Sequence, residues 1–181
     1  MIKSKPAVVL ALLLFVFPLL FIGQASAYNV SASTNFDKQF AGIGETFNAL
    51  MYVNPYGNEI AGIQSNFNFN PSIIRINYIS EGAFMSDNGK YQTFFNEGTI
   101  DNVNGTIVNT FDAIIGRHNT SNPGKFIIFN ITTIGYGSTT IVSSNIKIAS
   151  PEGMYVPVGG VMIFPIRVTH FGSISGGVNI R

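Results

Sequence analysis

The sequence predicts an all-β protein built as a two-sheet antiparallel β-sandwich. Three observations support this fold class: β-branched and aromatic residues fill short segments, turns rich in Gly, Pro and Asn separate these segments, and no segment sustains a helical period. Many short strands joined by regular turns are typical of a sandwich or a jelly roll. A parallel α/β fold is excluded because the crossover helices that it needs are missing.

The N-terminal residues 1–27 are expected to be an export signal and not part of the fold. Two lysines precede an apolar run over residues 7–22, and Ala25-Ser26-Ala27 has the small-x-small pattern that signal peptidases cleave. The alternative is an uncleaved membrane anchor, since the run borders on the roughly 17–25 residues that span a bilayer. The Ala-Ser-Ala pattern favours cleavage before Tyr28.

The mature region is expected to hold one domain, a β-sandwich over residues 28–170, followed by a linker-like tail over 171–181. The tail is either a frayed end or the start of a further β module. Loss of the signal leaves 8 basic and 9 acidic residues, a net charge of −1 with His neutral. This balance, with no basic run, excludes nucleic acid and anionic lipid as partners. The absence of cysteine excludes disulfides.

Three segments carry the clearest strand pattern. In residues 60–70 apolar side chains alternate with amides, and a period of two puts the two sets on opposite faces. In 125–133 the first half is apolar on both faces, as expected near the middle of a sandwich. In 138–149 the apolar phase drifts, which indicates a bulge or bend. In the first segment the inward set is Ile63, Phe67 and Phe69, and the outward set is Gln64, Asn66, Asn68 and Asn70.

Turns divide the mature region at residues 54–57, 87–89, 102–105 and 150–153. Gly and Asn tolerate a positive φ and Pro presets φ, which is why these residue types mark turns. Nine strands are expected in order: Asn29 to Thr34, Thr46 to Val53, Ile60 to Phe69, Ile73 to Ile79, Thr93 to Phe95, Thr106 to Ile114, Gly124 to Thr133, Ser138 to Ala149, and Met154 to Val168.

The chain offers little material for catalysis. Its two histidines have no acidic residue near them in the sequence, and it has neither a Cys nucleophile nor a Gly-x-Ser-x-Gly elbow. Glu97, Asp101 and Asp112 could supply paired carboxylates of the glycosidase kind. Their interpretation as turn and strand-edge charges is favoured. We therefore expect a protein that is not an enzyme and needs no cofactor.

The sequence gives little support for calcium or carbohydrate as a ligand. Residues 101–105 match an EF-hand loop poorly, because Val103 stands at a ligand position and Gly105 comes one position early, so a plain turn is favoured. A calcium site built from separated loops stays open. Sugar binding in sandwiches relies on exposed planar rings; Trp is absent, but tyrosines are available. These are Tyr52, Tyr56, Tyr78, Tyr91, Tyr136 and Tyr155.

Four Asn-x-Ser/Thr sequons are candidate glycosylation sites in the mature chain. Several are expected by chance in so Asn-rich a sequence. Any that carry glycan are expected on solvated turns. The four are Asn29, Asn104, Asn119 and Asn130.

The order of these elements resembles the cohesin family. Residues 62–74, GIQSNFNFNPSII, resemble the cohesin pattern of an alternating strand that ends in Tyr-Asp-Pro-x-x-Leu. Residues 76–84 resemble the strand and Gly-containing turn that follow, and 124–131, GKFIIFNI, are similar to a late strand of the same family. Residues 146–158 resemble the closing pair of strands. The resemblance runs over about residues 28–168, nearly the whole mature chain.

The resemblance implies a nine-stranded jelly roll whose flat sheet face receives a dockerin, a small calcium-binding helical module of another protein. It assigns partner binding to the outward residues Gln64, Asn66 and Asn68. The pair Asn109 and Phe111, or the pair Val108 and Thr110, would supply an apolar centre. Two departures remove the acidic contribution to recognition. Gly62 and Gln64 stand where cellulosomal cohesins tend to place Asn and Asp, and Asn70 replaces the Asp before Pro.

We therefore expect a secreted or cell-surface, cohesin-like module that attaches to a protein partner of the dockerin type and has no membrane segment once the signal is removed. Two alternatives from other classes stay open. One is a carbohydrate-binding module of a surface protein, with exposed coplanar tyrosines in a groove. The other is a purely structural surface-layer domain.

The export signal leads to the first prediction. A host that exports the full chain should release a protein whose N-terminal residue is Tyr28, because the signal peptidase recognises Ala25 and Ala27. Intact-mass spectrometry of the exported protein measures this directly. A membrane-bound product that retains Met1 would contradict the prediction.

Overall fold

The structure, a computed structural model, describes residues 29–170. The expected export signal over 1–27 and the expected tail over 171–181 lie outside the described residues. Within them the chain is all β, and no helix is long and apolar enough to cross a membrane.

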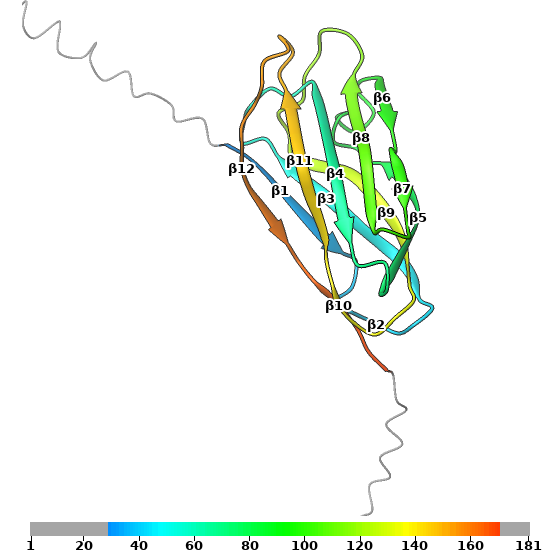
Figure 1. Cartoon of the computed structure of the whole chain (residues 1–181). Coiled ribbons are helices and arrows are strands. Elements are labelled where there is room, and N and C mark those ends of the chain that lie inside the picture. The colour runs from blue at the N-terminus through cyan, green and yellow to red at the C-terminus, as the bar shows by residue number, and fades with distance from the viewer. Residues whose placement is uncertain (1–28, 171–181) are drawn as a thin grey trace, which may run out of the picture.

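Two large sheets pack face to face and a small one closes an end (Figure 1). The β3 sheet has the order β12 (Val158–Ile163), β1 (Val30–Phe36), β3 (Thr46–Asn54), β9 (Gly124–Thr133), β5 (Ile74–Glu81). The β4 sheet has the order β11 (Ile141–Ala149), β4 (Gly62–Phe69), β8 (Thr106–Ile114), β6 (Thr93–Asn96), and β7 (Thr99–Asp101) also pairs with β8. The end sheet has the order β10 (Gly137–Thr139), β13 (Ile166–Val168), β2 (Phe40–Ala41).

The prediction of an all-β sandwich is confirmed, and most neighbouring strands are antiparallel. Two pairs are parallel, β1 with β12 and β2 with β13. Both pairs involve the last two described strands, between which the chain passes from the β3 sheet to the end sheet. The parallel pairs therefore place the last two described strands beside the first two.

The described residues form 13 strands, where nine were expected, because two expected strands are divided and two short strands were not expected. The segment 138–149 breaks at Thr140 into β10 and β11, which belong to different sheets. The segment 154–168 breaks around Pro165 into β12 and β13. A proline has no N–H to continue a ladder, and the chain changes sheets there. The short strands β2 and β7 have too few residues for a periodic pattern.

The core lies between the two large sheets. On β4 the alternation places Ile63, Phe67 and Phe69 inward, as predicted. On β9 both Phe126 and Ile127 are fully buried, in agreement with its predicted place near the middle of the sandwich. The ring of Phe67 meets that of Phe129 edge-on, with centroids 5.0 Å apart and planes at 80°. This contact joins an inner strand of one sheet, β4, to an inner strand of the other, β9.

The second prediction concerns this core contact. Phe67→Ala should lower the free energy of unfolding by about 3–5 kcal/mol, because it leaves a cavity between the sheets. Phe94→Ala is a matched control, since Phe94 is 62% exposed, and it should change the free energy by less than about 1 kcal/mol. Denaturant unfolding measures both values. Equal effects of the two substitutions would contradict the proposed packing.

Candidate functional site

The outer face of the β4 sheet carries the predicted binding residues. Gln64, Asn66 and Asn68 alternate with the buried positions of β4, so all three side chains point away from the core. Asn68 is exposed, whereas Gln64 and Asn66 are half-buried between the flanking strands β8 and β11. The structure therefore brings the three residues together in one row.

Two of the three amides already have partners within the fold. The Oδ1 atom of Asn66 accepts a hydrogen bond of 2.9 Å from the backbone N–H of Asn109. Asn68 Nδ2 donates to Ser144 Oγ at 3.2 Å. No side-chain hydrogen bond of Gln64 is found among the described residues. Gln64 is therefore the amide of this row whose side-chain oxygen and nitrogen are both available to a partner.

Bulges on both sides of β4 explain these bonds. On β8 the register against β4 shifts between Ser65 and Phe67, and Asn109 adopts a positive φ of 62°. On β11 the register shifts between Ser144 and Lys147, around Asn145 at φ 51°. The second shift confirms the bulge predicted in 138–149. Bulges turn side chains relative to a regular ladder.

The bulge in β8 decides which of its residues face outward. Thr110 is fully buried, whereas Phe111 is half-buried and Asn109 is exposed. Of the two alternatives, the pair Asn109 and Phe111 thus faces outward. Val108 is also 38% exposed, because the bulge interrupts the alternation. Phe111 lies directly opposite Gln64 in the β4–β8 register.

Aromatic side chains surround Gln64. The ring of Phe94 on β6 packs against that of Phe111, with centroids 5.6 Å apart and planes at 53°. On the other side Lys147 of β11 is paired with Gln64, and the side chain of Tyr155 is 66% exposed. A shallow cavity of about 380 Å³ opens here. Its lining includes Gln64, Phe111, Lys147 and Tyr155.

The sequence pattern did not predict three further members of this face, Phe94, Lys147 and Tyr155. A signal for Phe94 was present: two adjacent Phe residues in a short strand must point to opposite faces. The outward position of Lys147 depends on the bulge at Asn145. The alternation of apolar residues does not show how far this bulge shifts the inward and outward positions of β11. Tyr155 follows a turn and reaches the face through its bridge to Ala149.

A buried carboxyl group lies directly behind the face. Asp112 is 1% exposed, and neither of its oxygens accepts a hydrogen bond from a donor in the described residues. Burial, and then Glu81 across the sandwich, raise the pKa of Asp112 to about 7. Thr93 Oγ1 donates to Glu81 Oε1 at 2.6 Å. Burial and the negative charge of Glu81 both disfavour the ionised form of Asp112, so the folded state favours its protonated form.

The other acidic candidates do not join Asp112 in an open site. Asp101 accepts hydrogen bonds of 2.9 Å from the N–H groups of Val103 and Asn104, which lower its pKa and close the turn. This favours the plain-turn interpretation of 101–105. Glu97 is exposed just beyond β6. Because the carboxyl group of Asp112 is buried, a sugar substrate cannot reach it.

Each of the two histidines contacts a tyrosine side chain. His118 stacks on Tyr91 with centroids 4.9 Å apart, and His170 Nδ1 lies 3.0 Å from the hydroxyl of Tyr136. Within residues 29–170 no three His, Cys, Asp or Glu side chains gather closely enough to hold a metal ion.

The four sequons differ in their surroundings. Asn29 and Asn104 are exposed, and Asn119 is half-buried in the loop after β8. Asn130 lies within β9, and not on a turn as expected of a used sequon. Its Nδ2 donates to Asn48 Oδ1 at 3.1 Å, and its Oδ1 accepts from Asn77 Nδ2 at 2.9 Å. This ladder of amides leaves Asn130 poorly suited to carry glycan.

Comparison with known proteins identifies the fold. No family model matches the sequence, and no curated relative does. Among solved structures, the second type II cohesin module of the ScaA adaptor scaffoldin of Acetivibrio cellulolyticus superposes with a TM-score of 0.64 at 14% identity, covering 84% of this chain and 97% of that one. The non-cellulosomal cohesin of Archaeoglobus fulgidus gives 0.59 at 11% identity, covering 79% and 93%.

A third match comes from a type II cohesin–X–dockerin complex of Acetivibrio cellulolyticus, with a TM-score of 0.58 at 15% identity, covering 77% of this chain and 99% of that one. The described domain therefore has the cohesin fold, as the sequence resemblance implied. At these identities the likeness concerns the fold.

The third prediction follows from Asp112. Between pH about 3.8, its ordinary pKa, and pH about 7, only the folded state holds the proton, so unfolding releases it and rising pH destabilises the fold. Asp112→Asn cannot titrate. The free energy of unfolding of the wild type should therefore fall relative to that of the variant by about 1.4 kcal/mol per pH unit across this window, and then level off.

Denaturant unfolding from pH 4 to pH 8 tests this difference. Asp37→Asn, which changes an exposed carboxyl group, serves as the control. Parallel pH curves for the wild type and Asp112→Asn would contradict the raised pKa of Asp112.

Proposed function

We propose that this domain is an extracellular, non-catalytic module that binds a protein partner through the outer face of its β4 sheet. The observation that carries the proposal is the group of aromatic rings beside Gln64, exposed Phe94 and Tyr155 and half-buried Phe111, together with the Gln64 amide, for which no hydrogen-bond partner is found in the described residues. Aromatic residues are enriched at the centres of protein interfaces and charged ones are depleted there. The extracellular location rests on the predicted export signal.

The chemistry of the face indicates what the partner offers. Lys147 has no ion-pair partner among the described residues. A partner with a carboxylate near an apolar centre would pair with Lys147 while it covers Phe111. Asn66 and Asn68 are bonded within the sheet, so they contribute by holding β8 and β11 in place beside β4. Gln64 supplies the direct amide contact.

A dockerin-type module is the partner we propose. Support comes from the cohesin fold together with its occurrence in a structure described as a cohesin–X–dockerin complex. The tyrosine requirement of the carbohydrate alternative is not met on this face. The exposed tyrosines Tyr56, Tyr78, Tyr136 and Tyr155 belong to separate elements, and among them only Tyr155 borders the cavity beside Gln64.

The fourth prediction tests the proposed face. The exported chain is immobilised and exposed to proteins of its source, with calcium and then with chelator, and a captured protein is identified and its affinity measured. Phe111→Ala should weaken binding roughly 30-fold or more, since central aromatic residues contribute about 2 kcal/mol or more. Gln64→Ala should weaken binding severalfold, through the loss of a single hydrogen bond.

Tyr78→Ala is the matched control, because Tyr78 is 54% exposed on β5 of the other sheet. It should leave the affinity unchanged. Unfolding curves verify that each variant is folded. Undiminished binding by Phe111→Ala, or loss of binding by Tyr78→Ala, would move the interface away from the β4 sheet. Calcium-dependent capture of a protein with paired Asp/Asn-rich loops would support the dockerin-type partner.

A further inference from the structure

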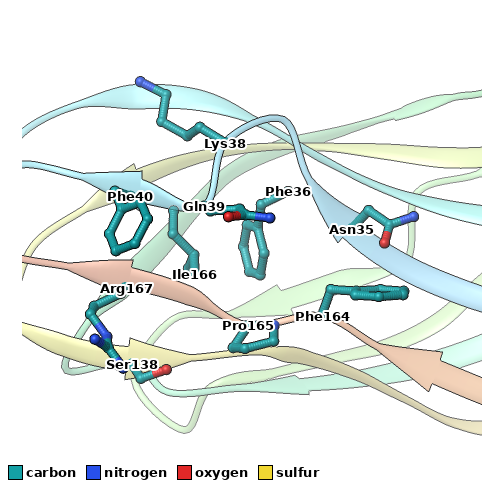
Figure 2. A pocket seen from close by; sticks show the side chains of 10 residues that line it. All are labelled: Asn35, Phe36, Lys38, Gln39, Phe40, Ser138, Phe164, Pro165, Ile166 and Arg167. Atoms are coloured by element: carbon teal, nitrogen blue, oxygen red, sulfur yellow. The ribbon is translucent and has the colours of Figure 1, made fainter.

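A second cavity lies away from the β4 face, where the chain crosses between sheets. It has a volume of about 510 Å³, within the range of ligand-binding pockets. Figure 2 shows it between the connection from β1 to β2 on one side and the segment that joins β12 to β13 on the other. None of its lining residues belongs to β4, β8 or β6, so it is separate from the proposed partner face.

Apolar rings line this cavity from end to end. Figure 2 shows Phe40 and Phe164 at opposite ends, with Phe36 and Ile166 between them. Ile166 is fully buried and forms a fixed floor. The rings of Phe40 and Phe164 are 55% and 48% exposed. Exposed rings at a concave site offer planar surfaces on which a flat ligand stacks.

The charge of the cavity is positive. Arg167 is exposed on β13, and among the described residues its guanidinium has neither an ion pair nor a hydrogen bond. Lys38 differs, since it pairs with Glu45 at 2.6 Å and its side chain points away from the cavity in Figure 2. No acidic residue lines the cavity. A guanidinium is suited to a carboxylate because its fork of donors matches both oxygens.

The same surface carries neutral hydrogen-bonding groups. Gln39 and Ser138 are exposed, and no hydrogen bond of either side chain is found in the described residues. The Asn35 amide makes one long bond of 3.4 Å to Ser33. The backbone beneath them is fixed, because Arg167 N–H donates to Gln39 O at 2.9 Å and Arg167 pairs with Ser138. Amides and a hydroxyl on a fixed backbone are suited to a ligand rich in hydroxyl groups.

We propose that this cavity binds an acidic saccharide, with its carboxylate on Arg167, its ring faces on Phe40 and Phe164, and its hydroxyls on Gln39 and Ser138. A peptide strand cannot add to β13, because β10 and β2 pair with both of its edges. At this strand a ligand is therefore recognised through side chains such as that of Arg167.

Titration calorimetry of the exported chain tests the proposal. The probes are trisaccharides of galacturonate, glucuronate and mannuronate, each compared with its carboxyl-reduced neutral counterpart. At least one acidic trisaccharide should bind with saturation, its neutral counterpart at least tenfold more weakly, and 0.5 M NaCl should weaken the acidic one. If none of the acidic trisaccharides binds, or if each neutral counterpart binds as tightly, the proposal is overturned.

Variants locate the site. Arg167→Gln should weaken binding at least tenfold, and Arg167→Lys should restore part of it. Arg117→Gln is the matched control, since Arg117 is an exposed arginine in the loop after β8, and it should leave affinity unchanged. Phe40→Ala should also weaken binding. Equal affinities of Arg167→Gln and Arg117→Gln would place the sugar elsewhere and overturn the assignment.

The result is distinguishable from that for the partner face. Phe111→Ala should leave saccharide binding intact, and Arg167→Gln should leave protein capture intact. An acidic peptide with an apolar C-terminal residue is included as a further probe. Binding of this peptide that depends on Arg167, together with no response to any saccharide, would overturn the saccharide assignment.

Discussion

The packing of β4 against β9 is the constraint on which the rest of the structure depends. Phe67 and Phe129 meet at the centre of the sandwich, and their contact decides which side of each strand is buried. Because side chains alternate along a strand, burying Phe67 turns its neighbours Asn66 and Asn68 toward solvent. A slip of one residue would bury the amides and expose the rings. The same contact therefore sets both the core and the character of the outer face.

The bulges beside β4 then adjust that face. Asn109 and Asn145 adopt positive φ values, a conformation that asparagine tolerates better than most residues. The bulge at Asn109 is held by Asn66, whose side chain accepts the backbone N–H beside it. An amide that the sequence presents as a recognition residue is thus part of the scaffold. In the proposed interface, Asn66 would act indirectly, through the position of Phe111.

The sequence was sufficient for the features that depend on local periodicity. It predicted the sandwich, the outward row on β4 and the bulge in 138–149, because each leaves a trace in the alternation of apolar residues. It did not predict the division of 154–168, since β12 and β13 differ only in which distant strand they pair with. It also interpreted Asp112 as a solvated charge. Asp112 is buried at an inward position of β8, and its raised pKa depends also on Glu81, which is distant in sequence and lies on the β3 sheet.

The two solvent faces of the sandwich show why one of them is suited to recognition. On the β3 sheet the amides of Asn48, Asn130 and Asn77 bond one another in a ladder across three strands, and Thr46 and Thr132 bond each other at 2.8 Å. Such a face has satisfied its own polar groups, so a partner gains little by replacing water there. On the β4 sheet no such ladder runs across the strands, and in the described residues no hydrogen bond is found for the Gln64 side chain, which lies beside the rings of Phe111 and Tyr155. With charged residues at only 10% of the chain, long-range attraction contributes little, and specificity must come from such local differences in hydrogen bonding and ring exposure.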